Sequence, residues 1–128
     1  LAMMILSLLI VGLLEQEDAA LIAKIPGVLA QAAAEAVVPQ QIDPTTTLVR
    51  VEADGMKLVY HYDSQELGVT RERLAHFFTT RNLPGICAER DMIFTMRLGV
   101  TFRYEWTTPD RSTPWVIEIT EDDCAAYQ

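Results

Sequence analysis

Residues 46–63 read TTLVRVEADGMKLVYHYD, and their pattern indicates a β-sheet. Between Thr47 and Asp54 the odd positions hold threonine, valine or alanine, while most even positions are polar. This period of two is typical of a half-buried strand. Asp54-Gly55 is a hairpin turn signal, and residues 57–62 (KLVYHY) favour a second strand. The stretch therefore predicts a β-hairpin with strands at 46–54 and 56–63.

A second stretch near the C-terminus alternates in the same way. One side of residues 100–107 carries large apolar residues, namely Val100, Phe102, Tyr104 and Trp106. Residues 108–111 (TPDR) suit a type I turn with proline at its second position. Residues 115–120 then alternate again, with Trp115 and the two isoleucines facing inward. These residues predict a second hairpin.

Residues 16–38 are rich in alanine and are predicted to be helical. We expect two pieces, because the tripeptide at 25–27 (IPG) interrupts the pattern. Pro26 would occupy the first turn of the second piece, where its missing N–H group has no consequence. Pro39 ends the helix, and residues 39–46 are predicted to be a polar linker.

Two further helices are predicted between the hairpins. The first spans 69–82 with Thr70 as its N-cap. Its buried stripe consists of Leu74, Phe77 and Phe78. The tripeptide at 83–85 (LPG) would break the helix, and a shorter helix at 89–98 would follow. Gly99 suits a left-handed C-terminal cap for that second helix.

The order of these elements predicts an α+β fold. After an N-terminal hydrophobic helix we expect a four-stranded antiparallel sheet, made of two hairpins, with two helices packed on one face. Residues 17–128 would form this single extracytoplasmic domain.

Residues 1–14 read LAMMILSLLIVGLL and carry no charge. A helix that is apolar on all sides needs lipid or protein around it. Fourteen residues would span roughly 21 Å, short of a hydrocarbon core of ~30 Å. Residues 1–16 are therefore interpreted as a single-span anchor, a signal remnant or a buried helix of a soluble oligomer. In an anchor, Ser7 and Gly12 are the small positions where a partner helix could approach.

The residues that follow this apolar run are acidic. Residues 15–18 read EQED, and the first basic residue is Lys24. Because basic flanks of an apolar segment favour the cytoplasm, this acidic flank favours a domain that lies outside the cytoplasm. An acidic first turn of the next helix would explain the same pattern. The expected location is the bacterial inner membrane with the domain in the periplasm, or the periplasm itself if the segment is cleaved.

The charge balance narrows the classes of partner that the chain is expected to bind. The chain of 128 residues has 18 acidic and ten basic residues, which gives a formal net charge of −8. No basic stripe is available to bind phosphates, so a nucleic acid is not an expected partner. All of the acidic and basic residues follow residue 14, so the average hydrophobicity describes neither part of the chain.

No catalytic or metal-binding motif stands out. His61 lies in a predicted strand and His76 lies on a predicted helix, and neither has a second ligand at metal spacing. The sequence contains no P-loop, no GxGxxG and no GxSxG pattern. We therefore expect no cofactor and no metal.

The two cysteines, Cys87 and Cys124, form no CxxC motif. An even number of cysteines in an exported domain favours one disulfide bond. Two unrelated buried thiols are the other interpretation.

Three segments resemble a family of small, uncharacterised bacterial proteins that are exported or membrane-anchored. They are TTTLVRVEADGMKLVYHY (45–62), GICAERDM (85–92) and GVTFRYEW with VIEITEDDC (99–124). The resemblance covers about two thirds of the chain and implies that the two cysteines pair. It implies an export or membrane segment, and it carries no activity.

Three functional hypotheses follow. The first is a non-catalytic accessory or structural subunit of an inner-membrane assembly, which contacts other membrane-protein subunits through residues 1–14. The alternative is a soluble periplasmic binding or chaperone-like module that uses the open face or edge of the sheet. A second alternative is a small enzyme that uses His61 or His76 in a cleft between sheet and helices. The candidate interaction residues are Ser7, Gly12, Arg50, His61, Arg103 and Glu118.

Overall fold

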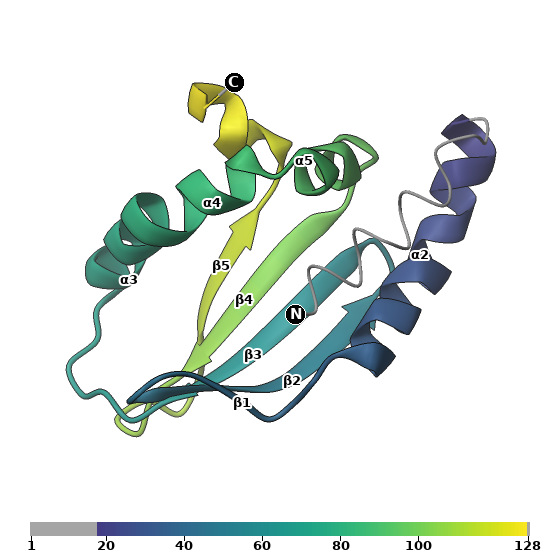
Figure 1. Cartoon of the computed structure of the whole chain (residues 1–128). Helices are drawn as coiled ribbons and strands as arrows, with labels where there is room; N and C mark the ends of the chain where they lie inside the picture. The colour runs from purple at the N-terminus through teal and green to yellow at the C-terminus, as the bar shows by residue number, and fades with distance from the viewer. Residues whose placement is uncertain (1–17, 128) are drawn as a thin grey trace.

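A five-stranded mixed sheet runs in the order β1-β2-β3-β4-β5 through the computed structural model, which describes residues 18–127 (Figure 1). The strands are β1 (Gln40–Asp43), β2 (Thr46–Asp54), β3 (Lys57–Ser64), β4 (Thr101–Thr107) and β5 (Trp115–Ile119). The helices are α2 (Asp18–Glu35), α3 (Arg71–Phe77), α4 (Leu83–Ala88) and α5 (Arg90–Arg97). A π-helical segment, η1 (Phe78–Asn82), joins α3 to α4, and a 3₁₀ segment, η2 (Glu121–Tyr127), follows β5.

Both predicted hairpins are confirmed, but the sheet they form differs from the prediction. β2 pairs with β3 and β4 pairs with β5, each antiparallel. β3 and β4 are parallel, with Lys57 opposite Thr101 and Asp63 opposite Thr107. The helices from α3 to α5 form a long crossover that returns the chain to the end of the sheet where β3 began. A purely antiparallel sheet was therefore the wrong expectation.

The fifth strand, β1, was not predicted. Residues 40–43 pair with β2 at the edge of the sheet, where we expected a polar linker. The Asp43 carboxylate accepts a hydrogen bond from the Thr45 backbone at 2.9 Å, which closes a tight turn between the two strands. A short, polar edge strand needs only one neighbour and no apolar face, so the QQID sequence shows no alternation.

A β-bulge changes the faces of β2. The register shifts between Leu48 and Arg50, so that Leu48 and Val51 are both buried while Val49 is 36% exposed. An extra residue in one strand moves the side chains beyond it to the opposite face. The uniform alternation expected from 47 to 54 is therefore interrupted at Val49.

Helix α2 is continuous, although two pieces were predicted. Its buried stripe consists of Leu21, Ile25, Leu29 and Ala32, which lie on both sides of the exposed Pro26. Tertiary packing of an apolar stripe supplies most of the stability of a helix in a protein. Packing on β2 and β3 therefore carries the helix through the proline.

The N-cap of the next helix is confirmed, because the Thr70 hydroxyl accepts a hydrogen bond from the Arg73 backbone at 3.2 Å. Leu74 and Phe78 are buried as predicted, whereas Phe77 is 40% exposed. The break predicted at 83–85 is absent. Pro84 instead lies in the first turn of α4, where a proline needs no N–H partner.

The chain bends only at Glu89, whose backbone is extended between α4 and α5. The short helix predicted at 89–98 is confirmed as α5, with Met92 and Met96 buried. Gly99 has a φ of +103°, a conformation that favours glycine, which agrees with its predicted role at the helix end.

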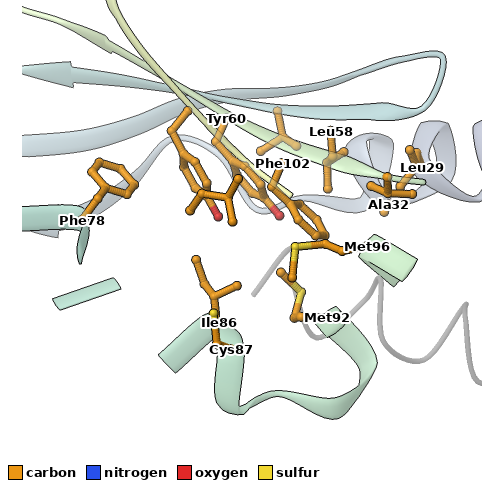
Figure 2. Packing of buried hydrophobic residues seen from close by; sticks show 14 of the residues in the cluster. Leu29, Ala32, Leu58, Tyr60, Phe78, Ile86, Cys87, Met92, Met96 and Phe102 are labelled. Atoms are coloured by element: carbon orange, nitrogen blue, oxygen red, sulfur yellow. The ribbon is translucent and has the colours of Figure 1, made fainter. Parts of the chain in front are cut away.

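One hydrophobic core joins all the helices to one face of the sheet. Figure 2 shows Tyr60 and Phe102 of the sheet facing Ile86, Met92 and Met96 of α4 and α5. Leu29 of α2 belongs to the same cluster. The structure thus has two layers, and the opposite face of the sheet carries no helix among the described residues.

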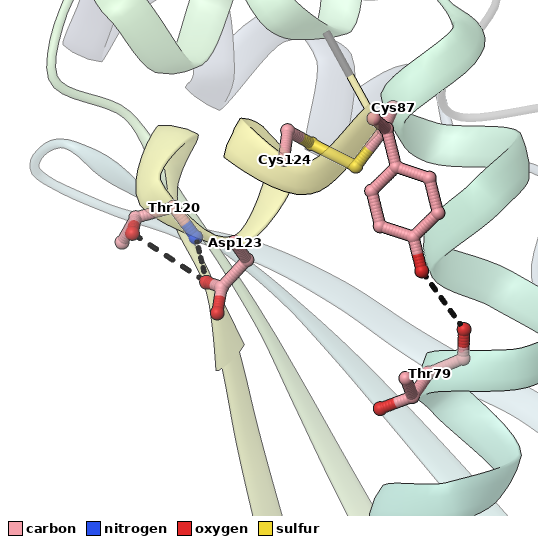
Figure 3. Close-up of a disulfide and its surroundings, with 6 residues drawn as sticks. Thr79, Cys87, Thr120, Asp123 and Cys124 are labelled. Atoms are coloured by element: carbon pink, nitrogen blue, oxygen red, sulfur yellow. Dashed lines mark hydrogen bonds between the residues drawn. A yellow bond between two sulfur atoms is a disulfide. The ribbon is translucent and has the colours of Figure 1, made fainter.

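The disulfide bond between Cys87 and Cys124 is confirmed (Figure 3). It links α4 to η2, and both residues are at most 4% exposed. Two hydrogen bonds support η2. The Asp123 carboxylate accepts from the Thr120 backbone at 2.8 Å, and the Tyr127 hydroxyl donates to the Thr79 carbonyl at 3.3 Å.

The predicted anchor at residues 1–16, with Ser7 and Gly12, lies outside the described residues. Within 18–127, no helix combines the length and the apolar character needed to cross a membrane.

Candidate partner-binding surfaces

The four candidate residues that fall in the described sheet lie together on its helix-free face, which we call the open face. Arg50 of β2 is opposite His61 of β3, and Arg103 of β4 is opposite Glu118 of β5. His61 is in turn opposite Glu105 of β4, which connects the two pairs. Because side chains alternate between the faces of a strand, the two-residue period places all of them on one side.

His61 lies between two carboxylates. Its Nε2 atom is 2.5 Å from Oε1 of Glu52, and its Nδ1 atom is 3.4 Å from Oε1 of Glu105. The His61 side chain is only 15% exposed. Arg50 approaches the same Glu52 oxygen at 3.3 Å. The imidazole is thus oriented by a carboxylate at each nitrogen.

Glu118 forms the other half of the network. Lys57 Nζ donates to its carboxylate at 2.8 Å, and Arg103 Nη1 donates to the same oxygen at 3.3 Å. The hydrogen bond from Lys57 is the main reason that the pKa of Glu118 is lowered. Arg103 also donates to Glu105 at 2.8 Å, and this bond raises the pKa of the guanidinium.

The open face therefore carries two groups of ion pairs, with His61 between them. One group consists of Arg50 and Glu52, and the other consists of Lys57, Arg103, Glu105 and Glu118. Opposite charges pair with one another, which leaves little uncompensated charge to attract a ligand. Exposed pairs of this kind typically contribute only ~0.2–1 kcal/mol each. Glu52, Lys57 and Glu105 belong to this network but were not predicted as site residues. All three lie at alternate positions on the same face as the predicted residues, and this period could have identified them.

Neither histidine lies in a cleft between the sheet and the helices, which is where the enzyme hypothesis placed it. His61 lies on the open face, away from the helices, and not between sheet and helices. His76 is exposed on α3, and its ring has no hydrogen-bond or ion-pair partner within residues 18–127. In this part of the chain no group of three or more His, Cys, Asp or Glu residues is arranged to hold a metal ion.

A hollow beneath α3 offers a different kind of surface, which we call the aromatic pocket. It has a volume of about 180 Å³. Its lining consists of Asp43, Thr46, Glu66, Val69, Arg73, Leu74, Phe77 and Trp106. Four of these residues are apolar, and the other four are a threonine, an arginine and two acids. The apolar half suits an apolar side chain of another protein.

Packed aromatic rings form one side of this pocket. The rings of Phe77 and Trp106 have centroids 6.4 Å apart, and Tyr62 packs on Trp106 at 5.0 Å. Burial raises the pKa of Tyr62 to about 12, so this ring stays neutral at physiological pH. The neighbouring Phe78 packs edge-on against Phe77 at 6.0 Å. The ring positions are thus well determined before any partner arrives.

One lining residue of the pocket and two residues adjacent in sequence to its lining are apolar and exposed. Ile42 is 51% exposed, Leu67 is 68% exposed and Phe77 is 40% exposed. Ile42 and Leu67 are the chain neighbours of the lining residues Asp43 and Glu66. Phe77 is the residue that both lines the pocket and is an exposed large apolar side chain, and exposed apolar side chains beside a pocket mark interaction sites. The sequence did not indicate this pocket, because Phe77 was expected in the core and residues 39–46 were expected to be a linker.

No family model and no curated protein matches the chain. Three solved structures share its fold. An inferred secreted protein of Pseudomonas aeruginosa matches with a TM-score of 0.64 and 14% identity, and the match spans 85% of this chain and 97% of that protein. EpsS, the pilotin of the Vibrio vulnificus type 2 secretion system, matches with a TM-score of 0.60 and 9% identity, and the match spans 84% of this chain and 94% of EpsS.

AspS, the type II secretion system pilotin of Vibrio cholerae, has a TM-score of 0.61 and 12% identity, and covers 84% of this chain and 100% of its own. At these identities the similarity establishes the fold alone. The five-stranded sheet with its helical layer is therefore an architecture that this chain shares with two pilotins and with the Pseudomonas protein.

Proposed function

We propose that this chain is a non-catalytic accessory subunit of a bacterial envelope assembly, and that its α+β domain binds a partner protein. The observation that carries the proposal is the fold, which two pilotins of type II secretion systems share over at least 94% of their own length. A pilotin is an accessory component of a secretion system, so the shared fold supports a comparable role.

The aromatic pocket is the proposed contact site on the domain. Phe77, Trp106 and Val69 would receive an apolar side chain of the partner. Burying apolar surface there contributes roughly 25 cal/mol per Å², and the entropic cost of association offsets part of this contribution.

The location that fits this role is the cell envelope. A structural disulfide such as Cys87–Cys124 persists in oxidising compartments, and the periplasm is one of them. We further propose that residues 1–16 form a single-span anchor in the inner membrane. Other membrane-protein subunits would then contact the chain through residues 1–14, with Ser7 and Gly12 as close-approach positions.

Purification of the tagged full chain from its bacterium in mild detergent tests the proposed function. We expect a complex with a defined envelope protein, and migration as a lone monomer would contradict the proposal. Phe77→Asp should abolish the complex, because it places a charge in the aromatic pocket. Ile22→Asp is the matched control, since Ile22 is 42% exposed and Phe77 is 40% exposed, and it should leave the complex intact.

A second candidate is a soluble periplasmic binding or chaperone-like module that uses the open face. Arg50, His61, Arg103 and Glu118 lie together there, as that hypothesis requires. N-terminal sequencing of the mature protein separates the two functions. A mature chain that starts after residue 14 supports the soluble module, and an intact N-terminus supports the anchored subunit.

A further inference from the structure

The outer edge of β5 is free. β5 is the last strand of the sheet, and within residues 18–127 no backbone group pairs with its outer side. A free edge exposes unpaired N–H and C=O groups, which another extended chain can satisfy. Nothing in the described structure occupies that position.

The two edges of the sheet are not equivalent. At the opposite edge, β1 has only four residues and its register shifts between Gln41 and Asp43, which are two common ways of blunting an edge. β5 pairs with β4 in continuous register from Trp115 to Ile119. It contains no proline, no lysine and no bulge, so it is the edge that remains competent to pair.

A hollow of about 120 Å³ accompanies this edge, and we call it the edge groove. It is lined by Ala75, Phe78, Thr79, Leu83, Ile117, Glu118, Ile119 and Asp123. Residues of α3, η1 and α4 line this hollow together with Ile117 and Ile119, so the helical layer borders the last strand. Ile117 is accordingly only half-buried, although its side chain faces the helical layer.

From these observations we propose that the β5 edge accepts an extended segment of the partner protein as a sixth strand. This inference rests on the proposed function, since it specifies how a partner docks. Apolar residues at alternate positions would enter the edge groove beneath Ala75 and Leu83. The residues between them would face the open side of the sheet, as in other strands.

The acidic residues that follow β5 further define the partner's segment. After β5 and Thr120 the chain continues with Glu121-Asp122-Asp123. Glu121 is paired with Arg97 at 2.7 Å, whereas Asp122 and Asp123, which lines the edge groove, form no ion pair within residues 18–127. A basic residue on the added strand beside this acidic end would be attracted, and an acidic residue would be repelled. The occupant is therefore an alternating apolar and polar segment of about five residues with a lysine or arginine at that end.

A second copy of this chain is the competing occupant of the edge. Two antiparallel β5 strands would be related by a two-fold axis perpendicular to the sheet, and the chain would then be a dimer without any partner. A dimer of the unsubstituted chain in light scattering that the Ala75→Arg substitution dissociates would therefore overturn the proposal.

A tethered strand tests the pairing without knowledge of the partner. The sequence KVTVTVT is added after residue 128 through a flexible glycine-serine linker of about ten residues, and the full chain is studied in mild detergent. The controls carry KVTPTVT, which cannot continue the ladder, or EVTVTVT, which reverses the terminal charge. Hydrogen exchange of the β5 amides is the readout.

We expect exchange in residues 115–119 to slow at least about tenfold with KVTVTVT, less with EVTVTVT, and not at all with KVTPTVT. The proline control has the same length and linker, so it separates strand pairing from a general effect of the tether. Equal exchange in the KVTVTVT and KVTPTVT proteins would overturn the proposal.

Substitutions in the edge groove test the natural partner. Ala75→Arg fills the groove from an exposed helix position, and Ala34→Arg makes the same change on the exposed surface of α2. Thermal melting of both variants confirms that they fold. We expect at least a tenfold loss of co-purified partner with Ala75→Arg only. If both variants retain the partner, strand addition fails while the proposed function stands. If the unsubstituted chain captures no partner, the proposed function itself fails.

Discussion

Loss of the Cys87–Cys124 bond is expected to destabilise the domain substantially. The bond joins residues 37 positions apart and so closes a long loop in the unfolded chain. In the chain-entropy model, closing a loop of this length removes about 13 cal/mol/K of unfolded-state entropy. At 298 K this corresponds to about 4 kcal/mol of stability, a large part of the 5–15 kcal/mol that is typical of a domain.

The effect should also be visible as a change in melting temperature. The described domain has about 110 residues, and an unfolding entropy of ~2.1 cal/mol/K per residue gives ~0.23 kcal/mol/K. A loss of about 4 kcal/mol therefore lowers the melting temperature by roughly 15–20 °C. The loop that opens contains α5, β4 and β5, so an unfolded chain without the bond can expand considerably.

Urea denaturation of the full chain in non-ionic detergent, with and without a phosphine reductant, measures the difference. Both cysteines are at most 4% exposed, so the reductant must be present during unfolding and refolding. We also expect a larger dependence of the unfolding free energy on urea, because the reduced unfolded chain exposes more surface. The double variant Cys87→Ala with Cys124→Ala is the control, since its stability should not respond to the reductant. A loss below about 1 kcal/mol on reduction would refute the chain-entropy argument.

Three further predictions concern the cap, the core and the open face. Thr70→Ala removes the N-cap hydrogen bond to Arg73 and should lower stability by about 1 kcal/mol in urea melts, whereas no change would show that the cap is dispensable. Phe102→Ala should lower the free energy of unfolding by about 3–5 kcal/mol, because Phe102 is fully buried. Leu67→Ala, at a position that is 68% exposed, should change it by less than about 0.5 kcal/mol. Equal losses in the two variants would contradict the assigned core. Lys57→Ala should raise the pKa of Glu118 toward its ordinary value of 4.5, as measured by carbon NMR titration, because it removes the main hydrogen bond that lowers this pKa. Because the pKa of Glu118 is lowered in the folded protein, the stability that this pair contributes is present above the ordinary pKa and is lost as the pH falls through the pKa of the folded state. An unchanged Glu118 pKa in the variant would contradict the pairing.

Local patterns in the sequence identified most of the regular structure. The hairpin around Asp54-Gly55, the N-cap at Thr70 and the helix end at Gly99 depend on interactions within a few residues, and all three are confirmed. Two expected breaks, at 25–27 and at 83–85, are absent from the helices. Packing of α2 on the sheet overrides the first, and the position of Pro84 in the first turn of α4 removes the second.

The candidate surfaces likewise divide into one that the sequence predicted and two that it did not. The period of two placed Arg50, His61, Arg103 and Glu118 on one face, because alternation is a local property of a strand. The aromatic pocket and the edge groove could not be predicted. Both need the helical segment from α3 to α4 to lie beside strands that are distant in sequence, and no local pattern encodes that position.

The sequence by itself determined that this chain is an acidic α+β domain with two hairpins, a helical segment between them and two cysteines suited to pair. Only the tertiary structure decided that β3 and β4 run parallel, that β1 completes one edge, and that β5 remains free at the other. Strand order depends on the path of the long crossover from α3 to α5, and that path is set by burial against the whole sheet. The surfaces left for a partner follow from that path.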